Sequence, residues 1–495
     1  MKNSEELRQQ LRSINRKSYP AYKGLKGLYH FGNYILSIDH VQGDPFASPS
    51  HISIQISHRD AGFPVEYYKD TLTGTTLCDY LTRQFEKQVS QYSFRAKGSG
   101  KSGLLTVSHC GQEILSRTAC EITEKGITAR FFVGFPANGR TINATELEKI
   151  LFDFLPVCIQ KSFFYSSLNA KELQNYIELA EDQEFIRQTL PAKNLCAFIA
   201  DGSILPRESG ISSRPMKASV PFTSPDSLRI SINLPHKGKI TGMGIPKGIT
   251  LIVGGGYHGK STLLNALELG VYNHIPGDGR EYVITDATAV KLRSEDGRFI
   301  KDVDISMFIN DLPNKKDTRC FSTLDASGST SQAAGIVESM EAGSHLFLLD
   351  EDTSATNFMV RDAFMQQVIQ REKEPITPFL ERAEDLYKKA GISTILVAGS
   401  SGAFFHIADT IIQMDNYVPK DITASVKKLC SQYPLPAVSV TDFQVPHSHR
   451  IMSRPAESSK RLRYNSRGNH SDSGAAKPER LKTRISGTDG FSLGR

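Results

Sequence analysis

The sequence lacks the features that mark secreted and membrane-embedded proteins. Its seven cysteines are odd in number and none belongs to a Cys-x-x-Cys pair, which favours free thiols in a reducing compartment over a disulfide scaffold. No apolar run approaches the roughly 20 residues that a membrane helix needs, and the first residues contain no apolar signal-peptide core. We therefore expect a soluble intracellular protein, of the cytoplasm or an organellar matrix, without membrane spans.

An excess of one charge is also missing from most of the chain. The formal net charge is +6, but residues 447–495 hold eleven Lys and Arg against four Asp and Glu, which leaves residues 1–446 close to neutral. A near-neutral body argues against a nucleic-acid footprint that covers a whole domain. Residues 436–495 are rich in Ser, Arg and Gly, which predicts a disordered basic tail. The tail would contact nucleic acid, act as a targeting signal or simply be solvated.

The length of the chain predicts more than one domain. At 495 residues it exceeds the roughly 250–300 residues at which a single core stops growing. Residues 1–220 mix strand and helix patterns and predict an N-terminal α+β domain. Prolines punctuate residues 215–235, which is typical of a linker, and a second domain is expected over residues 221–435.

Short apolar runs alternate with helical patterns in the second domain. The runs are 250–253, 282–284, 345–349, 393–397 and 410–414. This alternation predicts an α/β domain with a parallel sheet that helices cover on both faces.

A phosphate-binding motif of the form G-x-x-x-x-G-K-[ST] follows the first run. Its residues are Gly254, Gly255, Gly256, Tyr257, His258, Gly259, Lys260 and Ser261, and a helical pattern starts at Thr262. Glycines let backbone N–H groups turn toward phosphate, and the helix N-terminus adds its positive dipole. The eight motif residues and Thr262 are candidates for ATP binding, with Lys260 on the β- and γ-phosphates and Ser261 on Mg²⁺. The alternative is a glycine-rich strand-to-helix turn without a ligand.

A second Gly-Lys-Ser sequence occurs upstream, at Gly100, Lys101 and Ser102. Arg95 stands where the motif requires its first glycine, and a strand pattern at 104–107 follows in place of a helix. Because no helix N-terminus is offered to a phosphate there, we expect a hairpin turn or a loop that contacts a polyanion.

The strand pattern 345–349 runs directly into acidic residues. Asp350 is placed to hold Mg²⁺ through water, and Glu351 is placed to polarise the water that attacks the γ-phosphate. A solvated acidic strand end is the alternative.

These motifs resemble one family. Residues 349–357 look like the Walker B motif and D-loop of ATP-binding-cassette (ABC) ATPases, with Asp352 in place of the usual proline. The segment that contains Ser327, Gly328 and Ser329 lies where their signature motif is expected, 23 positions before Asp350. Residues 20–430 are similar to the predicted ATPases of the ABC class, through motifs that include 42–50, 202–207 and 277–281. The resemblance implies an ABC-type P-loop domain fused to a family-specific N-terminal domain.

The chain departs from the family pattern at one catalytic position. Most ABC ATPases have a histidine that contacts the γ-phosphate, and its place here falls at Gly399 or Ser400. Ser400, the candidate, can donate one hydrogen bond but cannot carry a proton as an imidazole does. Slow hydrolysis is therefore expected.

The family resemblance implies a site made by two chains, because the signature motif of one closes on the P-loop of the other. With one cassette per chain, we expect a homodimer that hydrolyses Mg-ATP through Lys260, Glu351 and Ser400. Ser327 and Gly328 of the second copy would contact the γ-phosphate. The alternative is a nucleotide-gated binding module or scaffold with negligible turnover.

RNA or another nucleic acid is the expected partner of this ATPase dimer. The basic loops 97–101 and 138–140, together with Arg207, would form an anion-binding rim. A small-molecule kinase is disfavoured by Glu351 and the signature spacing, and a helicase by the lack of a second motor domain.

Overall fold

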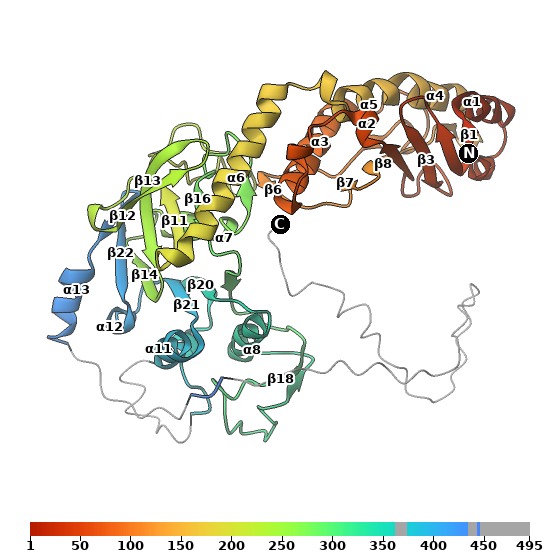
Figure 1. Cartoon of the computed structure of the whole chain (residues 1–495). Coiled ribbons are helices and arrows are strands. Elements are labelled where there is room, and N and C mark those ends of the chain that lie inside the picture. The colour runs from red at the N-terminus through yellow and green to blue at the C-terminus, as the bar shows by residue number, and fades with distance from the viewer. Residues whose placement is uncertain (362–373, 434–442, 446–495) are drawn as a thin grey trace.

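The computed structural model describes residues 1–361, 374–433 and 443–445. They form two domains, and the long helix α6 (Ala170–Ala192) runs from one into the other (Figure 1). The expected basic tail, 436–495, lies outside the described residues except for 443–445.

The N-terminal domain is built on a seven-stranded sheet with the order β1-β2-β3-β4-β8-β5, in which β7 also pairs with β8. These strands are β1 Lys2–Asn3, β2 Gly27–His30, β3 Ile35–His40, β4 Ser50–Ile56, β5 Leu105–Thr106, β7 Cys120–Thr123 and β8 Gly126–Val133. Its helices are α1 Ser4–Ser13, α2 His58–Ala61, α3 Thr71–Tyr92, α4 Ala144–Glu148 and α5 Leu155–Phe163. Helix α3 buries Leu77, Leu81 and Phe85 at helical spacing against the sheet, so an α+β domain is observed, as predicted.

The second domain begins with a four-stranded antiparallel sheet in the order β12-β13-β11-β16. The strands are β11 Leu195–Ala200, β12 Arg229–Leu234, β13 Gly238–Pro246 and β16 Val283–Thr285. Two expectations were wrong here. The run at 282–284 pairs with β11 and does not join the parallel sheet, and residues 229–234 of the expected linker form a strand. Pairing of β11 with β13 also joins residues on either side of the expected boundary at 220.

The other sheet of this domain is six-stranded, in the order β17-β20-β21-β14-β22-β23, and is parallel except for β23. The strands are β14 Ile249–Val253, β17 Val290–Leu292, β20 Leu346–Asp350, β21 Ser393–Val397, β22 Thr410–Asp415 and β23 Val418–Asp421. Four of the five predicted runs are therefore strands of this sheet. Phe347 and Leu349 face one apolar core while Leu346 and Leu348 face another, so both faces are covered.

The helices beside this sheet are α7 Lys260–Leu269, α8 Gly328–Glu341, α9 Thr356–Met359, α11 Phe379–Ala390, α12 Phe404–Ile407 and α13 Thr423–Cys430. Three strand pairs are short: β6 Glu113–Ile114 with β15 Asn273–His274, β9 Ala137–Asn138 with β10 Thr141–Ile142, and β18 Ile300–Val303 with β19 Phe321–Thr323. The first of them joins the two domains. Among the described residues, no helix has the length and apolar character to cross a membrane.

Candidate nucleotide-binding site

The phosphate-binding loop links β14 to α7, as predicted. Gly254 has a φ of +143°, and a Cβ at this position would lie 2.4 Å from the carbonyl oxygen of Met414 on β22. Only glycine therefore fits where the loop leaves the sheet. Gly259 is the N-cap of α7, so the unpaired N–H groups of the first helical turn are presented to the loop.

The turn between β22 and β23 holds the loop in place. The backbone N–H of Asn416 donates to Nδ1 of His258 at 3.0 Å, and that of Tyr417 donates to the carbonyl of His258 at 3.2 Å. Asp415 Oδ1 lies 3.6 Å from the same ring nitrogen. The His258 side chain thus braces the loop and leaves its backbone N–H as its available phosphate donor.

The Lys260 ammonium lies on the loop itself. Its Nζ donates to the carbonyl oxygens of Gly254 at 2.7 Å and of Gly255 at 2.9 Å. Ser261 and Thr262 follow in the first turn of α7, with Ser261 exposed and Thr262 half-buried. An ammonium, a hydroxyl and loop N–H groups together form the donor set that a magnesium-bound triphosphate needs.

Asp350 ends β20 at the edge of the sheet that also carries the loop. Only β21 stands between β20 and β14, so Asp350 and the loop share the carboxyl edge. Burial raises the pKa of Asp350 above its ordinary value, whereas the positive charges of Lys291 and Lys260 oppose that shift. A divalent cation bound there would favour the ionised carboxylate.

Glu351 follows Asp350 and is fixed by the residues after β21. Its Oε2 accepts hydrogen bonds from the N–H groups of Gly399 (2.8 Å) and Ser400 (3.1 Å), and its Oε1 accepts one from Ser400 Oγ (2.5 Å). Burial alone would raise the pKa of Glu351, but these hydrogen bonds outweigh it and hold the pKa below its ordinary value. The carboxylate is therefore ionised and oriented.

The signature segment starts α8. Ser327 is the N-cap residue, and its Oγ accepts a hydrogen bond from the N–H of Thr330. Ser329 Oγ donates to Asn357 Oδ1 at 2.8 Å, and Gln332 Oε1 accepts from the N–H of Ala355 at 2.9 Å. These two hydrogen bonds join the signature helix to the D-loop.

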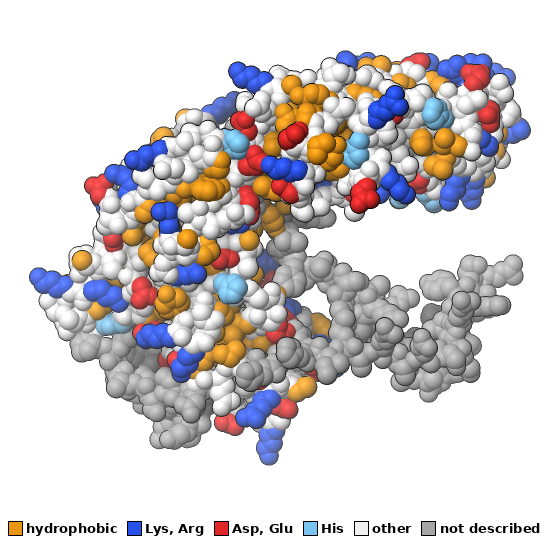
Figure 2. All heavy atoms as spheres, viewed as in Figure 1, with side chains coloured by type: hydrophobic (Ala, Val, Ile, Leu, Met, Phe, Trp, Pro, Cys, Tyr) orange, Lys and Arg blue, Asp and Glu red, His pale blue; other side chains and the backbone are white. Residues whose placement is uncertain are grey.

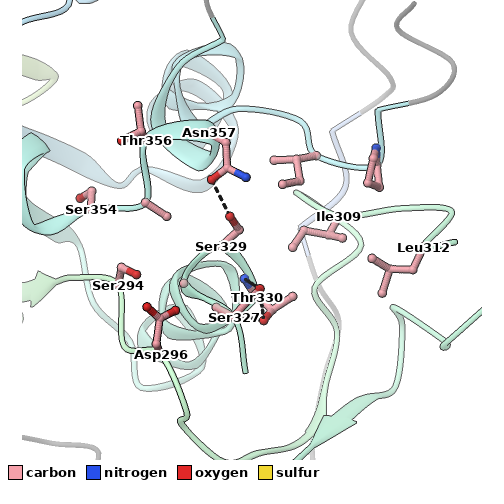
Figure 3. A pocket seen from close by; sticks show the side chains of 14 residues that line it. Ser294, Asp296, Ile309, Leu312, Ser327, Ser329, Thr330, Ser354, Thr356 and Asn357 are labelled. Atoms are coloured by element: carbon pink, nitrogen blue, oxygen red, sulfur yellow. Dashed lines mark hydrogen bonds between the residues drawn. The ribbon is translucent and has the colours of Figure 1, made fainter. Parts of the chain in front are cut away.

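A pocket of about 560 Å³ opens between these two segments (Figure 3). Its lining includes Ser294, Asp296 and residues 327–330 and 354–357, most of which carry polar side chains. A Cβ on Gly328 would lie 2.4 Å from Ser294 Oγ, so α8 and the 294–296 loop approach each other closely at this point.

A buried ionic network braces the far end of α7, and sequence reasoning missed it. Asp278 accepts hydrogen bonds from Arg207 at 2.9 Å and from the His274 ring at 2.8 Å, and the other ring nitrogen of His274 lies 3.1 Å from the Leu269 carbonyl. Arg280 donates to the Leu205 carbonyl at 2.8 Å. Burial raises the pKa of Asp278, but His274 and Arg207 lower it by more, so the net shift is downward.

This network corrects the role that the sequence suggested for Arg207. Its side chain is only 12% exposed and is paired with Asp278, whose side chain is fully buried. Arg207 therefore belongs to the support of the P-loop helix and takes no part in an anion-binding rim. The 277–281 motif, which contains Asp278 and Arg280, is the part of the sequence that points to this network, although the motif alone does not reveal its role.

The site residues fit magnesium that is bound together with a nucleotide. In the described part of the chain, no group of three or more His, Cys, Asp or Glu side chains forms a metal site made by protein alone. Ser261 and Asp350 carry the hard oxygen atoms that Mg²⁺ prefers, so Ser261 would bind the ion directly and Asp350 would hold it through water, with phosphates completing the shell.

Comparison with known proteins extends these observations. Residues 169–449 match the ABC_ATPase family model, described as a P-loop domain, and residues 4–166 match the model "ATPase of the ABC class N-terminal". The uncharacterized protein MJ1628 of Methanocaldococcus jannaschii is 31% identical over 266 residues, which are 51% of this chain and 58% of that protein. The chain thus matches less than two thirds of that relative's length.

Two solved structures are also similar. MJ1267, an ATP-binding cassette of an ABC transporter in its ADP conformation, is 13% identical over 39% of this chain and 88% of its own, with a TM-score of 0.26. An inward-facing putative metal-chelate type ABC transporter is 16% identical over 49% and 90%, with a TM-score of 0.30. With TM-scores this low, the two structures do not contribute to the family assignment. On the family models, which together match residues 4–166 and 169–449, the chain belongs to the ATPases of the ABC class and combines their N-terminal domain with a P-loop domain of the ABC ATPase fold.

Proposed function

We propose that this chain binds and hydrolyses Mg-ATP as a homodimer and uses closure of the dimer to grip RNA or another nucleic acid. The observation that carries the hydrolysis is the fixed, ionised Glu351 beside Asp350. A carboxylate held by three hydrogen bonds at the strand end next to the P-loop suits the orientation of an attacking water.

The homodimer is supported by the position of the signature segment. Ser327 and Gly328 start α8 and line an open pocket, which presents a helix N-terminus and hydroxyl groups to an anion that comes from outside the pocket. An ATP held by the P-loop of a second copy supplies that anion. Hydrolysis would loosen the pair by removing the phosphate that bridges them.

Turnover of ATP tests the enzymatic part. We expect Mg²⁺-dependent release of phosphate by the wild type and a drop of about 100-fold or more in Glu351→Gln, with ATP still bound, because the amide cannot polarise water. Equal rates in the two proteins would refute the role of Glu351.

Two basic loops of the N-terminal domain support the nucleic-acid partner, because the fold brings them together. Ser99 N–H donates to the Ala137 carbonyl at 2.7 Å, and Gly139 N–H donates to Ser99 Oγ at 2.9 Å. Lys101 N–H donates to the Pro45 carbonyl at 2.8 Å. This hydrogen bond places the 45–46 segment beside the two loops, and the Phe46 side chain there is 61% exposed. Basic side chains beside an exposed aromatic ring are typical of surfaces that bind single strands.

The surface charge limits where such a strand would bind. On the face shown in Figure 2, Lys and Arg side chains are interspersed with Asp and Glu over both domains. A local contact at the two loops therefore fits better than a footprint over a whole face.

Charge reversal tests the partner. We expect RNA binding that weakens with salt, and Lys97→Glu/Lys101→Glu should reduce both the affinity and the salt dependence. As a matched control, Lys388→Glu/Lys389→Glu changes the same charge on α11 of the other domain. Equal RNA affinity of the two double variants would contradict the proposed contact.

The contacts of Glu351 also favour a second candidate, a nucleotide-gated module with negligible turnover. Both carboxylate oxygens already accept hydrogen bonds from residues 399–400, and a lowered pKa makes Glu351 a weaker base. A wild-type rate no higher than that of Glu351→Gln, with ATP still required for RNA binding, would favour this candidate.

A further inference from the structure

Tyr257 occupies an unusual position in the phosphate-binding loop. Its φ is +64°, in the left-handed region that favours glycine, and its side chain is 99% exposed. Within the described residues its ring takes part in no hydrogen bond or ring contact. The loop thus accepts a strained backbone and presents an aromatic ring to water, two costs that a contact outside its own chain would offset.

The pocket beside the signature helix has a lining that suits a tyrosine. Ile309, Leu312 and Ile376 contribute an apolar part of the lining, and the serines and threonines of the signature segment and D-loop contribute hydroxyl groups. Figure 3 shows Ile309 and Leu312 on one side of the opening and Ser294 and Asp296 on the other. A tyrosine needs this combination, because its ring is apolar and its hydroxyl seeks a hydrogen bond.

The proposed homodimer brings the two features together. Tyr257 lies three residues before Lys260, on the loop that would hold the triphosphate, and it does not line the pocket of its own chain. Ser327, which would reach that triphosphate from the second copy, lines the pocket. A pairing that sets Ser327 against the phosphates of the other copy therefore sets the pocket against Tyr257.

We propose that Tyr257 of each copy docks into the pocket at the N-terminal end of α8 in the other copy when ATP closes the dimer. This inference rests on the proposed homodimer and adds a contact that involves no phosphate. Because the dimer is symmetric, the contact forms twice. Closure then depends on an aromatic anchor as well as on the bound nucleotide, as is usual for protein interfaces.

Cross-linking tests the contact directly. Tyr257→Cys and Leu312→Cys are introduced separately into Glu351→Gln chains that also carry Cys320→Ser and Cys430→Ser, the two cysteines that are not buried. The two proteins are mixed with a short bismaleimide, and sedimentation follows dimer formation in parallel. We expect a cross-linked dimer with Mg-ATP and little with Mg-ADP. Dimers that form with ATP but do not cross-link would overturn the inference and leave the proposed function standing, whereas the absence of any ATP-dependent dimer would refute both.

Two further variants test the anchor without cysteines. In the Glu351→Gln background, Leu312→Glu puts a charge into the apolar lining and should weaken the ATP-dependent dimer at least about tenfold. Leu429→Glu, on α13 and outside the pocket, is the matched control and should leave the dimer unchanged. Equal dimer affinity of these two variants would contradict the docking. Tyr257→Ala that weakens ATP binding by dilute monomer but not dimerisation would also overturn it, because the ring then contacts the nucleotide.

Discussion

The chain contains two Gly-Lys-Ser sequences that fold in different ways. Lys260 and Ser261 follow a buried parallel strand and open α7, so a helix N-terminus faces the loop. Lys101 and Ser102 precede the two-residue strand β5. Ser102 is buried and uses its hydroxyl inside its own loop, where it donates to the Ser99 carbonyl at 2.5 Å and accepts from the Ala137 N–H at 3.0 Å.

The difference shows that the elements around a motif decide its chemistry. In the downstream loop Lys260 Nζ donates to carbonyl oxygens of the loop itself and Ser261 is exposed, so both side chains are available to phosphate. In the upstream loop the same residue types close a turn, as the lack of a following helix predicted. Six variants follow, in four tests: four change a residue of one of the two loops, one changes the network that supports α7, and one changes the residue that holds Glu351.

The lysine pair gives the largest expected contrast. Lys260→Ala should reduce ATP turnover by about 100-fold or more, because one preorganised cation at the phosphates is lost. Lys101→Ala should leave turnover within about twofold of the wild type. A phosphate-release assay at saturating Mg-ATP measures both, and a similar loss in the two variants would remove the distinction between the loops.

The second-largest expected effect is a loss of stability when the ionic network behind α7 is broken. Asp278→Asn removes the carboxylate that pairs with Arg207 and accepts from the His274 ring, and should lower the free energy of unfolding by about 3 kcal/mol. Urea unfolding followed by circular dichroism measures this loss.

The pH dependence of that loss follows from the lowered pKa of Asp278. The folded-state pKa lies below the unfolded one, so the stabilisation is present above the unfolded carboxylate pKa and disappears as the pH falls through the folded value. The deficit of Asp278→Asn should therefore shrink between neutral and acidic pH. A deficit that does not change with pH would mean that the charge of Asp278 is not what stabilises the fold.

The serine pair separates stability from binding. Ser102→Ala leaves the buried Ala137 N–H without its acceptor and should lower the free energy of unfolding by about 1–2 kcal/mol, with nucleotide affinity unchanged. Ser261→Ala, at an exposed position, should change stability little and weaken Mg²⁺-dependent nucleotide binding by about tenfold. Thermal unfolding and nucleotide titration on both proteins test the contrast, and the opposite assignment of effects would contradict it.

Ser400 gives the smallest expected change. Ser400→Ala removes a hydrogen bond that lowers the pKa of Glu351, so that pKa should rise. Because the ionised carboxylate is the active form, the acidic limb of the turnover profile should move to higher pH, with a loss of about tenfold or less at neutral pH. An unmoved acidic limb would show that the pKa of Glu351 does not set it.

The sequence predicted the parts of the fold that local patterns specify. Residues 250–253, 345–349, 393–397 and 410–414 are buried parallel strands that neighbour one another in the sheet, and continuous apolar runs are typical of them. The run at 282–284 was misplaced, because three apolar residues do not reveal which strand they pair with. The prolines around residues 229–234 predict a linker, but these residues form strand β12 because they pair with β13, a partner that no local pattern reveals.

Contacts between distant residues explain the rest. Arg207 and Asp278 are 71 positions apart, and nothing in either motif shows that one neutralises the other. Family spacing predicts that Ser400 lies near the γ-phosphate but says nothing of its hydrogen bond to Glu351, 49 positions away. Such pairs follow from strand order at the edge of the sheet, which a single sequence does not encode in any local pattern.

Mixing two inactive variants tests the central claim most directly. Lys260→Ala lacks a working P-loop and Ser327→Arg lacks a working signature segment, so each protein alone should have no more than residual ATP turnover. If the two motifs act across a dimer, the equimolar mixture should regain about a quarter of wild-type turnover, because half of the randomly paired dimers are mixed and each has one intact site. A mixture as inactive as its components would show that P-loop and signature do not complete one another between chains.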